Sequence, residues 1–327
     1  MLVAAILAAG AAGCGGGGGG SGDAQSQSQT VSLQRSFLDA VHAIQPAVVQ
    51  IRTDQGLGSG IVFDDKGDVV TNAHVVGNAR QVVVTSAKGR RYQGKVLDAF
   101  VPNDVAVVHV DTSDLKPAKF ADSSKLQVGQ IVMAVGNPLG LRSSVTNGIV
   151  SALGRTVSEP GGATLPDTIQ TSAPINPGNS GGALVDLQGR VIGIPTLAAI
   201  DRELGGSAAP GIGFAIPSST VRDLAQQIVD KGHVVDSHRA YLGVQLASTT
   251  AASGAIVAAV QQAGPAAAAG IKAGDVIVSI DGHQTPAAGA VASALAQLKP
   301  GETAKVTVAH GDGSRDTFDV KLGQISG

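Results

Sequence analysis

The chain reads PGNSGG over residues 177–182, where one serine, Ser180, stands in a frame of glycines. A serine hydroxyl is a poor nucleophile at neutral pH unless a neighbouring base takes its proton. Glycines allow the backbone to approach a reacting carbonyl group and to point amide N–H groups at the oxygen that becomes negative. Taken alone, such a string is more often a turn than a nucleophile, so its meaning depends on the rest of the chain.

Two further segments offer the partners that a nucleophilic serine needs. Residues 70–76 read VTNAHVV and place His74 directly after a predicted strand, and residues 103–108 read NDVAVV and place Asp104 at the start of another. A histidine can accept the serine proton, and a carboxylate can hold the imidazole in the useful tautomer. The order His, Asp, Ser is that of the chymotrypsin class, not that of subtilisin or of the α/β-hydrolases.

These residues predict a catalytic triad of His74, Asp104 and Ser180 that acts on peptide bonds. The backbone N–H groups of Gly178 and Ser180 are the predicted oxyanion hole. Asp98 is the competing carboxylate, but it precedes a predicted loop, whereas Asp104 leads directly into an apolar strand. The sequence has no Cys and His cluster with metal-ligand spacing and no phosphate-binding loop, so we expect neither a metal nor another cofactor.

The composition limits what else the chain could bind. Of its 327 residues 15% are charged, and the net charge of −2 gives no reason to expect a nucleic-acid partner. Aromatic residues make up 2% of the chain and tryptophan is absent, so the core must be built from Val, Ile, Leu and Ala. The length is sufficient for two domains with cores of their own.

The N-terminal residues have the features of an exported protein. Residues 2–12 form an apolar run that is too short for a membrane-spanning helix of about 20 residues, and Cys14 follows it. This resembles a bacterial lipobox, which implies a lipidated Cys14 and a membrane-anchored lipoprotein of the cell envelope, facing outside the cytoplasm. The alternative is an ordinary signal peptide with an uninvolved cysteine. Residues 1–30 are therefore predicted to be a signal segment and a Gly-, Ser- and Gln-rich tether.

Short strands are predicted through the middle of the chain. Residues 31–44 carry apolar side chains at helical spacing, and many short Val- and Ile-rich runs broken by Gly, Asp and Asn follow. This pattern is typical of barrels or sandwiches. We predict a mainly β protein with a chymotrypsin-like double β-barrel domain over residues 31–232, with the triad in the cleft between the barrels. A helix at 217–231, capped by Ser218, Ser219 or Thr220, ends this domain. Its predicted apolar face consists of Val221, Leu224, Ala225, Ile228 and Val229.

A second module follows a polar linker at residues 233–240. Residues 241–327 contain five short apolar runs, and we expect a short helix at 265–269 and a longer one at 289–298. The module is compact enough to be an independent domain.

These segments together resemble the HtrA/Deg family of trypsin-like serine proteases. The similar segments are GSGIV (58–62), TNAHVV (71–76), DVAV (104–107), GNP (136–138), GIVS (148–151), QT (170–171), INPGNSGG (175–182) and GIGFAIP (211–217). The chain departs from the family's pattern at Ser172, Pro174, Ala183 and Pro195. Residues 241–327 look like a PDZ domain of the bacterial type.

The resemblance also suggests binding sites and partners. Tyr241, Leu242, Gly243 and Val244 resemble the PDZ loop that binds the C-terminal carboxylate of a peptide. The resemblance implies a homotrimer built through the protease domains, a role in protein quality control under stress, and regulatory loops at residues 154–168 and 195–211.

The predicted substrate pocket contains Pro174, Ile175 and Thr196. It has no aspartate that could pair with a substrate Lys or Arg, so we expect cleavage after small or medium aliphatic residues. The resulting hypothesis is a serine endopeptidase that cleaves unfolded or misfolded cell-envelope proteins and is regulated by peptide C-termini bound to its PDZ domain. The alternative is a latent protease that acts mainly as a chaperone or peptide sensor.

Overall fold

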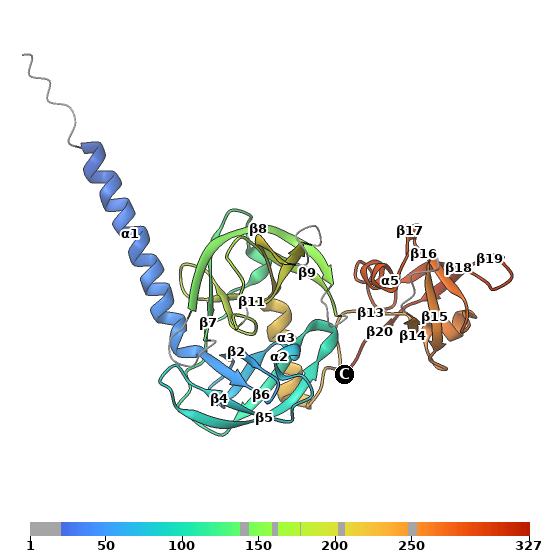
Figure 1. The fold of residues 1–327 in the computed structure, drawn as a ribbon, viewed down its shortest axis with the longest axis horizontal. Helices are drawn as coiled ribbons and strands as arrows, with labels where there is room; N and C mark the ends of the chain where they lie inside the picture. The colour runs from blue at the N-terminus through green and yellow to red at the C-terminus, as the bar shows by residue number, and fades with distance from the viewer. Residues whose placement is uncertain (1–20, 138–143, 159–162, 177, 202–206, 248–253) are drawn as a thin grey trace, which may run out of the picture.

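The computed structural model describes residues 21–137, 144–158, 163–176, 178–201, 207–247 and 254–327. Along its longest axis a helix, a pair of β-barrels and a smaller β module follow one another (Figure 1). Cys14 and Pro177 lie outside the described residues.

The first barrel is a closed sheet in the order β1-β2-β3-β6-β5-β4. Its strands are β1 (Val48–Arg52), β2 (Leu57–Val62), β3 (Asp68–Thr71), β4 (Gln81–Thr85), β5 (Arg91–Phe100) and β6 (Val105–Val110). Two short helical segments interrupt them: α2 (Ala73–Val76) follows β3, and the 3-10 turn η2 (Val101–Asn103) precedes β6. These two segments lie next to each other at one end of the barrel because β3 and β6 pair antiparallel.

The second barrel repeats this architecture in the order β10-β11-β12-β9-β8-β7. Its strands are β7 (Ile131–Gly136), β8 (Ser144–Ser158), β9 (Thr164–Thr171), β10 (Ala183–Val185), β11 (Val191–Asp201) and β12 (Ser207–Pro217). The short 3-10 turn η3 (Ser123–Lys125) lies in the connection between the barrels. The mainly β, double-barrel prediction is confirmed.

One hydrophobic core spans both barrels. It is built almost wholly from Val, Ile, Leu and Ala, with Phe100 its one fully buried aromatic side chain among the described residues. Each fully buried aliphatic side chain stabilises the fold by about 1.5–3 kcal/mol. The many buried Val and Ile side chains therefore supply the hydrophobic stabilisation that aromatic side chains give in other cores. A second cluster lies inside the second barrel, and a third belongs to the C-terminal module.

Helix α3 (Ser218–Lys231) packs against the barrels and joins their cores. The predicted apolar face is confirmed, since Val221, Leu224, Ala225 and Ile228 are buried. The predicted cap is wrong: Pro217 is the N-cap residue and no side chain of the helix caps it. Instead, Ser123 in η3 accepts the Ser219 N–H at 3.1 Å, a contact between residues too far apart in sequence to be predicted from local signals.

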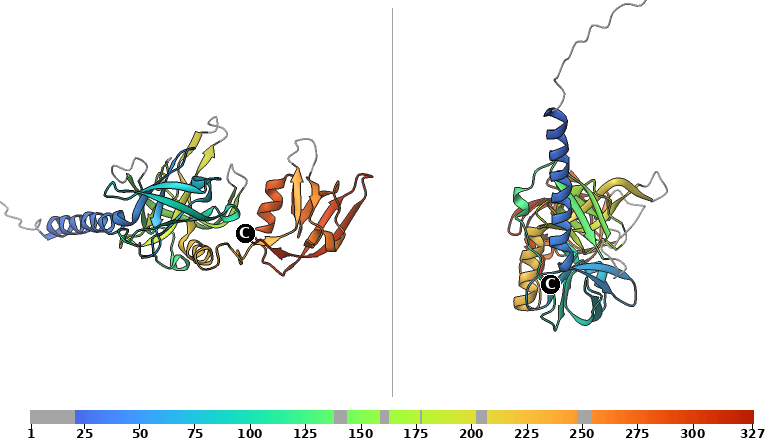
Figure 2. Two further views of the ribbon diagram at one scale, coloured as in Figure 1. Left: turned by 90° about the horizontal axis from the view of Figure 1, so that it is seen from below. Right: turned by 90° about the vertical axis from the view of Figure 1, so that its left-hand side faces the viewer.

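The N-terminal helix is longer than the sequence suggested. α1 runs from Ser21 to Ile44, ten residues further than the apolar spacing alone indicates, and it projects from the barrels in every view (Figures 1 and 2). Its polar first half contains no Gly after position 22 and no Pro, so nothing in it breaks the helix. The last turns are anchored by buried Ala40 and Ile44. No described helix has both the length and the apolar character to cross a membrane.

Two segments expected as loops are mostly strands. β8 and β9 extend into residues 154–168, and β11 and β12 extend into residues 195–211. The pairing of β8 with β9 contains repeated register shifts, and Gly154 has a φ of +69°. Bulges of this kind tolerate the glycines that the sequence pattern marks as breakers.

The C-terminal module has its own sheet, in the order β14-β15-β16-β18-β19, with β17 paired to β16. Its strands are β13 (Ala240–Tyr241), β14 (Val244–Ala247), β15 (Ala255–Val260), β16 (Val276–Ile280), β17 (His283–Gln284), β18 (Thr303–Ala309), β19 (Arg315–Lys321) and β20 (Gly323–Gln324). The helices are α4 (Pro265–Ala269) and α5 (Ala288–Leu295), close to the predicted positions. The last strand, β20, pairs with β13 beside the linker, so the C-terminus lies at the junction of the domains (Figure 1).

Candidate active site

His74 and Asp104 meet where α2 and η2 lie side by side. The His74 Nδ1 atom is 3.0 Å from Asp104 Oδ1 and 2.9 Å from Oδ2, and the His74 backbone N–H donates to Oδ1 at 2.9 Å. The carboxylate is 3% exposed, whereas the imidazole is 45% exposed. The buried Asp104 side chain thus holds the Nδ1 edge of the imidazole, while almost half of the His74 side-chain surface stays exposed.

Two more side chains hold Asp104 in place. The Asn72 amide donates to the Asp104 carbonyl at 3.1 Å, and the Thr196 hydroxyl donates to Oδ2 at 2.7 Å. Asp104 itself has a left-handed backbone with a φ of +51°, which turns the chain from η2 into β6. The carboxylate therefore accepts hydrogen bonds from both barrels, because Thr196 belongs to the second.

A β-bulge explains the position of Thr196. The register of β11 against β12 shifts between Pro195 and the residue two positions later, so Thr196 is the extra residue in β11. A bulge breaks the alternation of a strand and re-aims a side chain, and a proline, which lacks a donor N–H, is tolerated there. Thr196 was predicted to line the substrate pocket, which stays a prediction; its hydroxyl bonds to Asp104.

Ser180 lies between the two barrels, half-buried, and both of its oxygens are engaged. Its hydroxyl donates to the Thr196 carbonyl at 3.1 Å, and its own carbonyl accepts the Ser59 N–H at 2.9 Å. The hydroxyl therefore has to leave the Thr196 carbonyl before the imidazole can take its proton.

The backbone of the serine loop leaves two N–H groups unpaired. The N–H groups of Asn179, Gly181 and Gly182 donate to the carbonyls of Asn176, Pro195 and Asn179, at 3.0, 3.1 and 2.9 Å. Within the described part of the chain, the N–H groups of Gly178 and Ser180 have no such acceptor. Gly178 and Ser180 are half-buried, so these two donors are open to an external acceptor such as water or a substrate carbonyl oxygen.

The residues expected to bind substrate have different surroundings. Ile175 is 7% exposed and packs beside Gly213 of β12, where an added Cβ would come within 2.4 Å of Ile175 Cγ1. Pro174 is exposed, and its carbonyl accepts the Thr146 hydroxyl at 2.8 Å. Ile175 and Gly213 thus form an apolar wall beside the serine loop, and Gly213 was not found from the sequence.

The predicted carboxylate-binding loop of the C-terminal module lies at the edge of its sheet. Leu242 is buried, Gly243 has a φ of +79°, and β14 follows as an edge strand that pairs only with β15 among the described strands. The Leu242 carbonyl accepts the Ala266 N–H and the Gly243 carbonyl accepts the Gln261 N–H, both at 2.9 Å. An edge strand with a glycine turn before it can add a peptide as a further strand.

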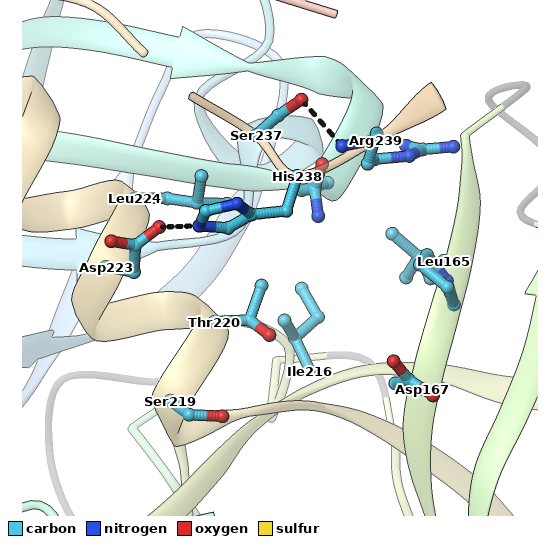
Figure 3. A pocket seen from close by; sticks show the side chains of 12 residues that line it. Leu165, Asp167, Ile216, Ser219, Thr220, Asp223, Leu224, Ser237, His238 and Arg239 are labelled. Atoms are coloured by element: carbon cyan, nitrogen blue, oxygen red, sulfur yellow. Dashed lines mark hydrogen bonds and ion pairs between the residues drawn. The ribbon is translucent and has the colours of Figure 1, made fainter. Parts of the chain in front are cut away.

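A cavity of about 330 Å³ lies at the junction of barrels, α3 and linker rather than at Ser180. Figure 3 shows Ser237, His238 and Arg239 of the linker along one side of it, facing side chains from β9 and α3. Arg239 donates to the Pro102 carbonyl, directly before Asn103 and Asp104. The cavity therefore marks a contact between the linker and the segment that carries the triad carboxylate.

His74 and Asp104 contact each other on the first barrel, and Ser180 of the second barrel contacts Thr196, which also bonds to Asp104. The triad of His74, Asp104 and Ser180 stays a prediction. Asp98 lies in β5, and the imidazole bonds to Asp104. Three further residues of the site, Asn72, Thr196 in its observed role and Ser59, were not recognised from the sequence. Asn72 and Ser59 stand within the motifs around His74 and Gly58, which was the available signal. The described residues contain no group of three metal-ligating side chains.

Comparison with known families divides the chain in the same way. Residues 58–194 match the model of the trypsin-like peptidase domain, and residues 240–322 match that of the PDZ domain.

Curated relatives cover most of this chain. A DegP-like periplasmic serine endoprotease of Brucella suis is 44% identical over 263 residues, which are 77% of this chain and 49% of that protein. The periplasmic serine endoprotease DegP of Escherichia coli K12 is 41% identical over 279 residues, 83% of this chain and 57% of that protein. The chain thus spans about half the length of the curated relatives it matches.

Solved structures agree over a larger share of both chains. The HtrA-type protease AlgW with a decapeptide superposes with a TM-score of 0.61 at 30% identity and covers 88% of this chain and 98% of its own. A serine endoprotease from Yersinia pestis gives a TM-score of 0.60 at 31% identity, with the same coverage.

Proposed function

The chain belongs to the HtrA family of trypsin-like serine proteases with one C-terminal PDZ domain, and we propose that it is an active serine endopeptidase. The observation that carries the proposal is the pair of orphan N–H groups on Gly178 and Ser180, next to a serine hydroxyl and a carboxylate-bound imidazole. No metal or cofactor is needed for this chemistry.

In the proposed mechanism the Ser180 hydroxyl turns from the Thr196 carbonyl to His74 and attacks the scissile carbonyl carbon. His74 takes the hydroxyl proton and later gives it to the leaving amine, while Asp104 keeps the proton on Nδ1 and stabilises the imidazolium. The carbonyl oxygen becomes negative and accepts hydrogen bonds from the N–H groups of Gly178 and Ser180. One such donor lowers the barrier by about 3–4 kcal/mol.

We propose that the bond cleaved follows a small or medium aliphatic residue. The wall formed by Ile175 and Gly213 is apolar and carries no carboxylate among its described residues. A charged substrate side chain would lose its hydration there without gaining a partner. Product mass spectra dominated by Lys or Arg at the new C-termini would overturn this preference.

We further propose that the PDZ domain binds peptide C-termini at the loop of Tyr241 to Val244 and that this binding regulates cleavage. The edge strand β14 and the glycine turn before it support strand addition by a peptide. The substrates proposed are unfolded or misfolded proteins of the cell envelope, since several relatives are named periplasmic endoproteases.

Two proposals concern assembly and location. A homotrimer is supported by exposed apolar side chains on α1, where Val31, Leu33 and Leu38 are 59%, 43% and 51% exposed. Lipidation of Cys14 would place the protease on the outer side of a membrane; the residue lies outside the described part of the chain. Light scattering of the purified chain gives the molar mass in solution and so tests the trimer. Intact mass spectrometry of the membrane-bound form shows whether a lipid is attached to Cys14.

The enzyme proposal is tested by a fluorophosphonate probe and by digestion of an unfolded model protein. Label on Ser180 that disappears in Ser180→Ala, together with digestion by the wild type alone, supports the peptidase. The resting hydrogen bond of Ser180 to Thr196 favours a second reading, a latent protease that acts mainly as a chaperone or peptide sensor. Absence of label even with unfolded protein and C-terminal peptides present would support that alternative.

A further inference from the structure

Ser59 of β2 connects the first barrel to the serine loop of the second. It is fully buried, and its hydroxyl donates to the Gly178 carbonyl at 2.6 Å and accepts the Asn137 N–H at 2.8 Å. Its backbone N–H donates to the Ser180 carbonyl at 2.9 Å. One small side chain and its own amide thus reach three points on the opposite barrel.

The direction of the Ser59 hydroxyl proton follows from its two partners. A backbone N–H can only donate, so Asn137 must face a lone pair of the hydroxyl, and a carbonyl can only accept, so the proton must point at Gly178. No rotation of the hydroxyl exchanges these roles. The geometry therefore allows a single hydrogen-bonded state.

This state holds the peptide unit between Gly178 and Asn179 at both ends. Ser59 binds its carbonyl oxygen, and its N–H, on Asn179, donates to the Asn176 carbonyl at 3.0 Å. The N–H groups of Gly178 and Ser180 belong to the peptide units on either side of it. With the middle unit fixed, only the φ of Gly178 and the ψ of Asn179 still set the relative orientation of these two donors.

The close approach of the two barrels at this point requires glycine at position 181. Gly181 has a φ of +78°, and a Cβ there would lie 2.1 Å from the Ser59 carbonyl oxygen and 2.3 Å from Thr71 Oγ1. The Ser59 backbone thus packs directly against Gly181, the residue after the proposed nucleophile. Any side chain at 181 would push Ser59 away from the serine loop.

We propose that Ser59 is a positioning residue that holds the two oxyanion-hole donors of Gly178 and Ser180 in their reactive arrangement. The inference rests on the proposed peptidase function and deepens it. A side chain of the first barrel, Ser59, would help to set the shape of the serine loop in the second barrel. Ser59 touches neither substrate nor the reacting atoms and acts only through the Gly178 carbonyl.

The test is Ser59→Ala, which removes one oxygen and leaves the Ser59 N–H bond to Ser180 in place. Thr168→Val is the matched control: it also deletes one buried hydroxyl, which donates to the Arg155 carbonyl at 2.8 Å and lies apart from the serine loop. Both variants are compared with the wild type on an internally quenched peptide with valine before the cleaved bond, and in the rate of fluorophosphonate labelling.

We expect kcat of Ser59→Ala to fall roughly 10- to 100-fold, because loss of a whole oxyanion donor costs about 10²–10³ and a displaced donor costs less. KM should change little and the pH profile should keep its shape, since the peptide-binding wall and the His74–Asp104 pair are untouched. Labelling should slow by a similar factor, and Ser59→Cys, whose thiol is a weaker donor, should lie between. Thr168→Val should retain wild-type kcat.

Amide hydrogen exchange gives a readout that does not depend on activity. The Asn179 N–H should exchange at least about tenfold faster in Ser59→Ala than in wild type, because loss of one hydrogen bond frees the peptide unit to rotate. The proposal is overturned by wild-type kcat with unchanged Asn179 exchange, by a loss confined to KM, or by an equal loss in Thr168→Val. If Ser59→Ala does not fold, Ser59→Cys carries the same comparison. An unlabelled, inactive wild type would instead overturn the peptidase function, and exchange at Asn179 would still decide the role of Ser59.

Discussion

At the scale of single residues, the site depends on a carboxylate that is buried yet fully hydrogen-bonded. Asp104 accepts from the His74 ring, the His74 backbone and the Thr196 hydroxyl, and it is 2% exposed. A buried charge without such partners would cost several kcal/mol, so each partner offsets part of the cost of burying this carboxylate.

Asp104→Asn keeps the shape of the side chain but presents an amide where His74 Nδ1–H needs an acceptor. We expect kcat/KM to fall roughly 10⁴-fold, because the imidazole is then held in the wrong tautomer. Steady-state kinetics on the quenched peptide measures the loss, and circular dichroism checks that the fold is retained. A loss of less than tenfold would show that Asp104 does not orient the base.

Thr196→Val removes the hydroxyl on Asp104 Oδ2 and keeps the backbone carbonyl that accepts from Ser180. A hydrogen bond to a charged group is worth about 1.5–3 kcal/mol, so kcat/KM should fall roughly 10- to 100-fold. Thr196→Ser, which retains the hydroxyl, should restore most of the activity. If Thr196→Val and Thr196→Ser are equally active, the Thr196 hydroxyl does not contribute to catalysis and only the backbone of the bulge matters.

At the scale of elements, His310 ties the ends of two strands of the PDZ domain together. Its ring lies 2.8 Å from Asp275, which precedes β16, and 3.1 Å from Asp316 on β19. Hydrogen bonds to Asp275 and then Asp316 raise the pKa of His310 above its usual 6.5. The protonated ring is favoured in the folded state because both nitrogens then donate to carboxylates.

The raised pKa predicts a PDZ domain that is less stable at alkaline pH. The stabilisation by His310 is fully present below about pH 6.5, the value of the unfolded chain, and is lost as the pH rises through the higher pKa of the folded state. Urea unfolding of the full chain, followed through the PDZ transition at pH 5.5 and pH 8.5, measures this. His310→Asn should be destabilised at the lower pH and approach the wild type at the higher one. An equal difference at both values would contradict the prediction.

At the scale of the whole molecule, the linker is fastened to the segment that carries Asp104. Arg239 donates to the Pro102 carbonyl, and burial of its guanidinium lowers its pKa to about 10, so it stays charged at neutral pH. The C-terminus joins the same region, where the Gly327 N–H donates to the Val234 carbonyl at 2.8 Å. A further contact joins the two domains: Gln297 of the PDZ domain donates to Thr156 of β8 at 2.8 Å.

Arg239→Met, made in the Ser180→Ala background to prevent self-digestion, should loosen the linker. It keeps much of the packing of the side chain but removes the charged donor, a contact worth about 1.5–3 kcal/mol. Thermolysin should then cut residues 233–240 about tenfold faster or more than in Ser180→Ala alone, and mass spectrometry of the early fragments locates the cut. Lys272→Met, which alters an exposed cation of the PDZ domain that does not share a described cavity with Arg239, is the control. Equal cutting of both variants would mean that Arg239 does not hold the linker.

The sequence by itself determined the β class and the presence of a protease and a PDZ domain, and it predicted the triad, because these depend on local signals. Alternating Val and Ile runs predict strands, and His74, Asp104 and Ser180 each stand in a short motif whose chain order is informative. The same local signals placed the apolar face of α3 correctly, since helical periodicity is a property of one segment.

Only the tertiary structure decided how these motifs support one another. Ser123 caps α3, Thr196 turns out of β11 onto Asp104, and Ser59 holds the Gly178 carbonyl across the barrel interface. Each contact joins residues about 90 or more positions apart. The contact of Thr196 depends on a bulge and that of Ser59 on a close approach at Gly181, and neither feature has a periodicity to detect. A hydroxyl in a sequence shows that a donor exists; the packing of the two barrels decides which carbonyl or carboxylate it meets, because hydrogen bonds require partners within about 3 Å in a fixed direction.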